Sequence, residues 1–143
     1  MTTTHVRAHD TEERWLLYDA TEHTLGRMAA VIAVNLMGKD RPTFTFSEGC
    51  NTHVVVINAA KARLTSKKQD EKEYQHYTGY ASGRKVVSIN RVRERRPTDI
   101  VTLAVRRMLP KSRLGHDMLR NLKVYGGDDH PHSPQSPVKV DSL

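Results

Sequence analysis

Cysteine is almost absent from this 143-residue chain, in which Cys50 is the single thiol. One thiol excludes a disulfide within the chain and fits a reducing compartment. Long apolar runs are also missing, since no stretch approaches the ~20 residues that a membrane-spanning helix needs. The first ten residues lack the apolar segment of a secretory signal peptide, so we expect a cytoplasmic protein.

Apolar residues are in short supply as well, at 37% of the chain against 27% charged residues. This balance predicts a lean core and a large polar surface. The length fits one domain, and neither an internal repeat nor a linker divides the sequence. We therefore expect residues 14–143 to form a single domain with an irregular C-terminal tail, and residues 1–13 to be a flexible extension.

Negative charge is scarce in one segment. The chain has a net charge of +7 and a pI of about 9.8. Residues 91–123 hold ten basic and three acidic residues, which accounts for the whole excess. The other 110 residues hold 13 basic and 13 acidic groups and balance to zero. The positive charge is therefore a regional feature and not a property of the whole surface.

A basic region favours an anionic partner, either nucleic acid or an acidic membrane surface. Most of the basic residues between positions 91 and 123 are Arg, whose planar guanidinium forks onto phosphate and stacks on bases. We favour nucleic acid. The alternative is a set of solvated helix faces on which Arg side chains form ion pairs with Asp99 and Asp117. Two carboxylates, however, can neutralise only two of these arginines.

Apolar patterning predicts an α/β fold. Residues 14–19 read as a short buried strand, and Thr24 is placed to cap a helix that ends at Gly38. The β-branched run at residues 54–57 is typical of a strand buried on both faces. Strand, helix and strand in this order form a βαβ unit with a right-handed crossover.

The second half is predicted to be mainly helical. Residues 72–77 alternate loosely and indicate a strand or ribbon, and Ser88 begins a short helix through Arg95. Pro97 is expected to break the chain before a helix capped by Thr98, which stops ahead of Pro110. A third helix starts at Ser112, residues 123–125 return as a strand, and residues 126–137 are an irregular tail.

Short motifs follow one another along the chain: Thr24-Leu25-Gly26-Arg27, Val56-Ile57-Asn58-Ala59, Tyr77-Thr78-Gly79-Tyr80, Ala104-Val105-Arg106-Arg107-Met108-Leu109-Pro110-Lys111, Leu122-Lys123-Val124-Tyr125 and Asp129-His130-Pro131-His132. Their joint order and spacing resemble the bacterial ribosomal protein L-thirteen family, the thirteenth protein of the large ribosomal subunit. The resemblance covers roughly residues 14 to 137.

The resemblance implies a three-layer α/β/α sandwich around a four-stranded, mainly parallel sheet. It also implies binding to large-subunit ribosomal RNA, contact with neighbouring ribosomal proteins and a part in early subunit assembly, and it leaves messenger RNA open as a further ligand. The chain departs from the family pattern in the loop at residues 47–52, at residues 81–83, at Arg107, where Gly is common, and at His116, where Arg is common. These changes affect local loop contacts and leave the expected fold intact.

The candidate RNA-binding residues combine the basic segment, a Gly- and Tyr-rich loop and smaller basic groups. Tyr can stack on unpaired bases, and Gly lets backbone approach a phosphate closely. For the loop, the alternative is that the tyrosines cover the hydrophobic core. For Lys39 and Arg41, the alternative is that their charges stabilise the dipole of the helix that ends just before them. The full set is Arg27, Lys39, Arg41, Lys61, Lys67, Lys68, His76, Tyr77, Tyr80, Arg84, Lys85, Arg106, Arg107, Lys111, Arg113, His116, Arg120, Lys123, His130 and His132.

Other functions have weaker support in the sequence. His130 and His132 beside Asp128 and Asp129 suggest a divalent cation, but a structural zinc site usually has four ligands with thiolates or more His. Cys50 near His53 suggests a thiol nucleophile, yet no third orienting group is evident. A small nucleotide-dependent enzyme would need a Gly-rich phosphate fingerprint, which the loop before Leu25 lacks. We expect no cofactor, no metal, no catalysis and no homo-oligomer, and we keep a free regulatory RNA- or DNA-binding module as the other alternative.

Overall fold

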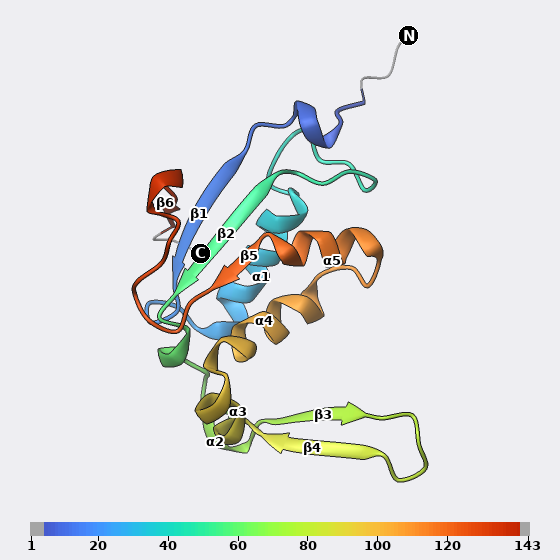
Figure 1. The fold of residues 1–143 in the computed structure, drawn as a ribbon, viewed down its shortest axis with the longest axis vertical. Helices are drawn as coiled ribbons and strands as arrows, with labels where there is room; N and C mark the ends of the chain where they lie inside the picture. The colour runs from blue at the N-terminus through green and yellow to red at the C-terminus, as the bar shows by residue number, and fades with distance from the viewer. Residues whose placement is uncertain (1–4, 141–143) are drawn as a thin grey trace.

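The computed structural model describes residues 5–140 and centres on a four-stranded parallel sheet (Figure 1). Its strands are β1 (Arg14–Asp19), β2 (Thr52–Ile57), β5 (Leu122–Val124) and β6 (Val138–Lys139), in the order β5-β2-β1-β6. β1 pairs with β2 along its whole length, from Arg14 opposite Thr52 to Asp19 opposite Ile57. The expected α/β class with a four-stranded parallel sheet is confirmed.

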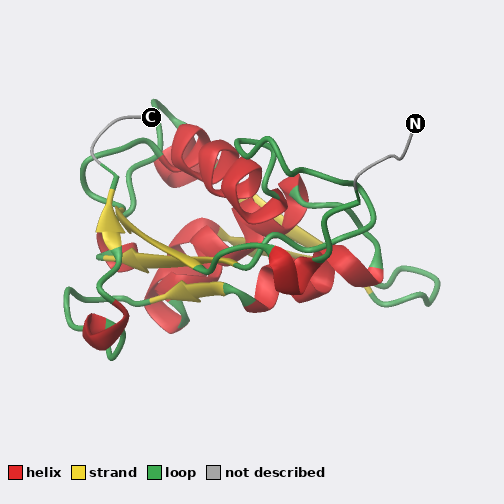
Figure 2. Ribbon diagram, turned by 90° about the horizontal axis from the view of Figure 1, so that it is seen from above, coloured by secondary structure: helices red, strands yellow, loops and turns green. Residues whose placement is uncertain are grey.

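Helices flank this sheet. They are α1 (Leu25–Met37), α2 (Lys68–Glu71), α3 (Ile89–Arg95), α4 (Pro97–Met108) and α5 (Arg113–Arg120), with short 3-10 turns η1 (Ala8–Asp10), η2 (Ala59–Lys61) and η3 (Ser133–Gln135). Figure 2 shows helices packed alongside the strands. Within residues 5–140, no helix is both long enough and apolar enough to span a membrane.

The core lies between the sheet and the long helices. Alternate strand residues such as Tyr18 and Val56 pack with Ile32 of α1 and Val101 of α4, and all four are completely buried. The buried amide of Asn35 donates a hydrogen bond to the Tyr18 hydroxyl, which satisfies a polar group inside the core. Burial also raises the pKa of Tyr18, so this hydroxyl stays neutral.

The opposite sheet face is covered by the C-terminal segment. Trp15 stacks on His53, with ring centroids 4.4 Å apart, and it also lies 5.1 Å from the ring of His132. The His132 Nε2 atom is 2.9 Å from the Tyr125 hydroxyl. The chain then adds β6 to the edge of β1, a strand that the patterning did not predict.

A separate hairpin projects from the helical side of the molecule (Figure 1). It consists of β3 (Glu73–Tyr77) and β4 (Arg84–Ser88), which pair with each other in antiparallel register and form their own sheet. The strand predicted at residues 72–77 is therefore present, but it does not belong to the central sheet. Tyr74 is the buried residue of this hairpin and anchors its base.

Helix boundaries follow most of the predicted signals. Gly38 ends α1 in the left-handed conformation at φ 79°, and the Ser112 hydroxyl accepts a hydrogen bond from the Gly115 amide at the start of α5. The prediction for Pro97 is wrong in detail, because Pro97 is the first residue of α4 and Arg96 is its N-cap. Proline is well suited to the first helical position, since the missing amide hydrogen would have no partner there.

Residues 5–13, part of the predicted N-terminal extension, contact the loop after α1. The Glu48 carboxylate accepts a hydrogen bond from the Ala8 amide at 3.3 Å, and the Asn51 side chain donates one to the Thr11 carbonyl at 3.2 Å. Glu48 and Asn51 belong to the loop that departs from the family pattern. The first four residues of the extension lie outside the described residues.

Candidate nucleic-acid interface

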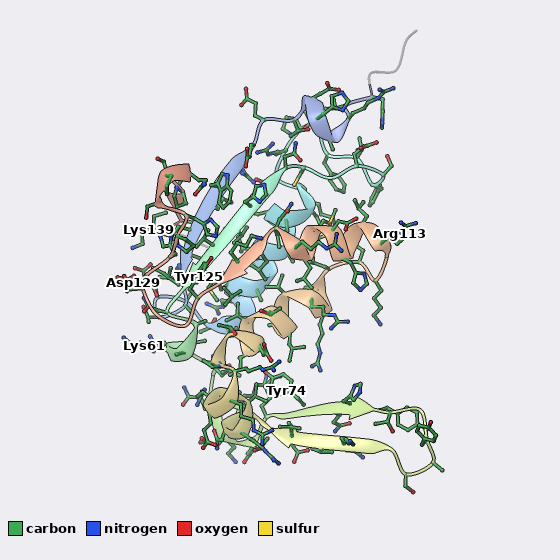
Figure 3. All side chains as sticks on the ribbon, viewed as in Figure 1. Lys61, Tyr74, Arg113, Tyr125, Asp129 and Lys139 are labelled. Atoms are coloured by element: carbon green, nitrogen blue, oxygen red, sulfur yellow. The ribbon has the colours of Figure 1, made fainter. Side chains whose placement is uncertain are left out.

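Most of the basic segment lies in α4 and α5, which are joined by a short turn at residues 109–112. Gly115 allows the first turn of α5 to pack closely against the turn, because a Cβ at this position would clash with the Pro110 carbonyl oxygen. The turn between the helices places Lys111 and Arg113 near the last turn of α4, which carries Arg106 and Arg107. In Figure 3, Arg113 lies at the outer end of α5, on the side toward which the hairpin projects.

Most cations of this helix pair have no carboxylate partner. Within residues 5–140, Arg106, Arg107, Lys111 and Arg113 form no ion pair and all four side chains are exposed. Asp117 pairs with Arg120 at 3.2 Å on the exposed face of α5, whereas Asp99 forms no ion pair among the described residues. Carboxylates therefore neutralise very little of the positive charge here.

A groove of about 570 Å³ opens between the hairpin and the two helices. We call it the α5 groove. Strand β3 contributes His76 to its lining, α4 contributes Arg106 and Arg107, and the turn and α5 contribute Lys111 and His116. Five of the predicted RNA-binding residues thus come together from β3, α4, the turn and α5. The His116 ring nitrogen Nδ1 lies 2.8 Å from the Ser112 carbonyl, which orients the ring within the first turn of α5.

A second groove, of about 500 Å³, lies on the other side of Arg107. We call it the α1 groove, because the first turn of α1 forms one wall. Arg27, Lys68 and Arg107 line it, together with Lys72 and Tyr74, which the sequence-based site did not include. Tyr74 and His76 are two positions apart on β3, so they share a face of the strand. That spacing is the sequence signal that could have identified Tyr74.

Tyr74 and Arg107 line both grooves. The Arg107 guanidinium carbon lies 5.6 Å from the centroid of the Tyr74 ring, and the Lys72 ammonium lies 5.5 Å from the same centroid. These are cation–π contacts. Burial raises the pKa of Tyr74, and the nearby Arg107 and Arg93 offset part of that rise. The contact between Arg107 and Tyr74 joins the end of α4 to the base of the hairpin and separates the two grooves.

The tip of the hairpin presents the other predicted aromatic and basic residues. Tyr77 and Tyr80 are 62% and 79% exposed, so they do not cap the core. Tyr77 pairs with Arg84 across the hairpin, and His76 pairs with Lys85. Gly79 has φ 91°, and the position that a Cβ of Gly83 would take lies 2.2 Å from the Thr78 hydroxyl. The hairpin turn itself therefore accounts for both glycines.

The remaining candidates lie apart from the two grooves. Lys39 and Arg41 follow α1, and the Arg41 guanidinium donates a 2.8 Å hydrogen bond to the Glu12 carbonyl. Lys61 lies in η2, away from the hairpin (Figure 3), and Lys67 precedes α2. Other candidates make local contacts: the Lys123 ammonium donates to the Arg120 carbonyl at 2.9 Å, and His130 and His132 belong to the aromatic cluster on the sheet.

The residues that suggested catalysis or metal binding have other partners. The Cys50 thiol lies 3.2 Å from both the Leu36 carbonyl and the Thr52 hydroxyl, and His53 stacks on Trp15. Among residues 5–140, no group of three or more His, Cys, Asp or Glu side chains is arranged to hold a metal ion. His130 Nδ1 instead accepts a hydrogen bond from the His132 amide at 3.2 Å.

Fold and surface together define a basic α/β protein with two cation-lined grooves beside an exposed aromatic hairpin. The sequence pattern of the family "Ribosomal protein L13" matches residues 13–131. The chain belongs to this family. It is 44% identical to "Large ribosomal subunit protein uL13" of Thermosipho africanus, over 96% of this chain and 93% of that protein. It is also 44% identical to the proteins of the same name from Aquifex aeolicus, over 99% and 98%, and Halorhodospira halophila, over 99% of both chains.

Proposed function

We propose that this protein is a structural constituent of the large ribosomal subunit that binds large-subunit ribosomal RNA and supports early assembly of the subunit. The carrying observation is the row of unpaired cations on the α4–α5 helix pair, Arg106, Lys111 and Arg113, in a chain whose relatives are named as large-subunit proteins. Arg106 and Lys111 line the concave α5 groove, and Arg113 is the first residue of α5, two positions after Lys111. Folded RNA is recognised through its shape, phosphates and 2′-hydroxyl groups, which such a surface suits.

The role of each element follows from its chemistry. Arg106 and Arg113 offer forked donors to phosphate oxygens, and Lys111 adds a mobile point charge between them. Tyr77 and Tyr80 are free to stack on unpaired bases of the RNA. The hairpin and the helix pair then meet different RNA segments and hold them together. Binding alone performs this function, so no catalytic step is required.

The proposal also covers location and partners. The protein would act in the cytoplasm within the ribosome, next to other large-subunit proteins. Binding of messenger RNA would use the same cations and stays a secondary proposal. The large-subunit proteins that resemble this chain match it over nearly its full length, which supports a ribosomal role rather than that of a free regulatory module.

Sedimentation tests the proposal directly. A lysate fractionated on a sucrose gradient at moderate salt should contain this chain with the large subunit, and with lighter precursor particles if it joins early. Its recovery in the soluble top fractions alone would contradict the ribosomal role. In purified form, the logarithm of affinity for large-subunit RNA should fall by roughly 0.7–0.9 per phosphate contact for each unit of log salt. A slope near zero would rule out binding through these cations.

A further inference from the structure

The α1 groove carries positive charge that nothing on its surface balances. Four cations line it, Arg27, Lys68, Lys72 and Arg107, and its lining includes no carboxylate. Within residues 5–140, none of the four forms an ion pair. They come from α1, α2, the residue after α2 and the last turn of α4, so the fold gathers charges that lie far apart in sequence. A concave surface lined by one sign of charge concentrates ligands of the opposite sign.

The floor of the same groove is apolar. Leu25, Leu64, Leu103 and Met108 line it, and the Met108 side chain is 44% exposed. A double-stranded RNA backbone presents phosphates and sugars but no apolar face, so it would leave this floor in contact with water. An unpaired nucleotide presents a phosphate and a flat base together. The groove volume of about 500 Å³ is in the range of small-ligand sites.

We propose that the α1 groove holds one unpaired nucleotide of an RNA strand. Its phosphate lies between Arg27 and Lys68, and its base lies against the Arg107 guanidinium and the leucine floor. Arg107 is suited to this position, because its contact with Tyr74 holds the guanidinium at the edge of the groove. The inference rests on the proposed function and adds to it. The α5 groove meets the phosphates of folded RNA, whereas the α1 groove selects single-stranded RNA.

Binding of the full chain to two probes tests this selection. The probes are a single-stranded oligouridylate of about ten nucleotides and an RNA duplex of similar length, both at the same salt concentration. The double variant R27Q/K68Q should lower affinity for the single strand about tenfold, because the phosphate loses two charge-assisted contacts. The control R91Q/R95Q removes two charges from the exposed face of α3, outside both grooves. It should lower affinity for both probes slightly and equally.

A variant that fills the groove without changing charge provides a second test. Ala104 lines the groove from α4, and A104M places a longer apolar side chain there while keeping a good helix former. A104M should lower affinity for the single strand about fivefold or more and leave duplex binding unchanged, at an unaltered melting temperature. If A104M unfolds, the R27Q/K68Q comparison still decides. Equal losses for R27Q/K68Q and the control, or full single-strand affinity in a folded A104M, would overturn the proposal.

Competition separates a nucleotide site from a simple anion site. Uridine monophosphate should displace the single strand at concentrations where inorganic phosphate of equal ionic strength does not, and equal displacement would overturn the proposal. The proposed function fails in a different way. Suppose that replacing Arg106, Lys111 and Arg113 abolishes RNA binding while the α1 groove variants have no effect. That result would contradict the nucleotide site in the α1 groove and leave the proposed function intact. Absence of the wild-type chain from large subunits would remove the proposed function.

Discussion

The cations of the α4–α5 helix pair differ from those near the N-terminus in what they contact. Arg106, Lys111 and Arg113 are exposed and form no ion pair within residues 5–140. Near the N-terminus, Arg14 at the start of β1 pairs with Asp40 at 2.7 Å, with both side chains about 30% exposed. Arg41 in the same region donates to the Glu12 carbonyl. One group of cations connects parts of the protein to each other, and the other group remains available to a ligand.

This comparison shows that charge by itself does not define a binding surface. A cation whose partner lies within the protein contributes to stability, because its removal leaves a half-buried carboxylate without its counter-charge. A cation that faces water contributes little to stability, because solvent and salt screen it. The two regions should therefore respond in opposite ways to loss of charge: RNA affinity should change in the first, and the free energy of unfolding in the second.

The largest expected effect is on RNA affinity. Joint replacement of Arg106, Lys111 and Arg113 by Ala should weaken binding to large-subunit RNA on the order of 100-fold, about 2.7 kcal/mol, since three charge-assisted contacts to phosphate are lost. The melting temperature should hardly change. The control variant replaces Arg91, Arg95 and Arg96, three exposed arginines outside both grooves, with Ala. A filter-binding titration in which both triple variants lose the same affinity would show that diffuse charge drives binding.

The next effect concerns the geometry that places these cations. Gly115→Ala should destabilise the fold by about 2 kcal/mol, because the added methyl group would meet the Pro110 carbonyl oxygen. Thermal unfolding should then shift down by roughly 4–8 °C. Gly127→Ala is the matched control, since nothing lies within 4 Å of the Cβ position there. A Gly115→Ala protein as stable as the control would mean that the turn at Pro110 can move away from α5 without loss of stability.

Removal of a paired cation should have a moderate effect on the free energy of unfolding and none on RNA affinity. Arg14→Ala should lower the free energy of unfolding by about 1 kcal/mol, since Asp40 loses its 2.7 Å partner. Affinity of the folded variant for RNA should match wild type. Arg7→Ala, which removes an exposed side chain without an ion pair, should be neutral in both assays. Chemical denaturation curves measure the difference, and a larger loss of affinity than of stability in Arg14→Ala would reverse the comparison.

The smallest expected effect is a pH dependence from His53. Burial against Trp15 lowers the pKa of His53, with further lowering from Lys123 and His132 and partial opposition from Glu13. The unfolded chain then binds more protons than the folded one between the lowered pKa and about 6.5, so stability should fall as pH falls through that window. His53→Phe keeps a ring on Trp15 and should reduce this loss. Identical pH profiles of wild type and variant in thermal melts would exclude His53 as the cause.

Local patterns were sufficient for most of the fold. Gly38 at the end of α1 and Ser112 at the start of α5 act through their immediate neighbours, so their types alone indicated the helix boundaries. The parallel pairing of β1 with β2 followed from a βαβ pattern with a buried β-branched run. Pairing between distant segments was harder to foresee. β6 is two residues long, with no apolar period of its own, and β4 carries mostly exposed residues.

The candidate site was predicted in its composition but not in its arrangement. The excess charge of residues 91–123 pointed to Arg106, Lys111 and Arg113, because a count of charges needs no coordinates. The α1 groove was missed as a unit. Arg27, Lys72 and Arg107 are separated by long stretches of sequence, and no local rule indicates that α1, the start of the hairpin and α4 meet. Tyr74 was also missed, although its spacing of two positions from His76 was a signal that could have identified it.

The sequence by itself determined the α/β class, the family, the boundaries of the main helices and the segment that holds the net positive charge. Each of these depends on residue type and on spacing within a few turns or strands, which the linear order records directly. Tertiary structure decided which cations find a partner. Arg14 reaches Asp40 across the end of the sheet, and Arg107 reaches Tyr74 across the base of the hairpin. Coulombic and cation–π contacts act over a few ångströms. Whether a given cation has a partner within the protein therefore depends on which distant segments the fold brings close to it.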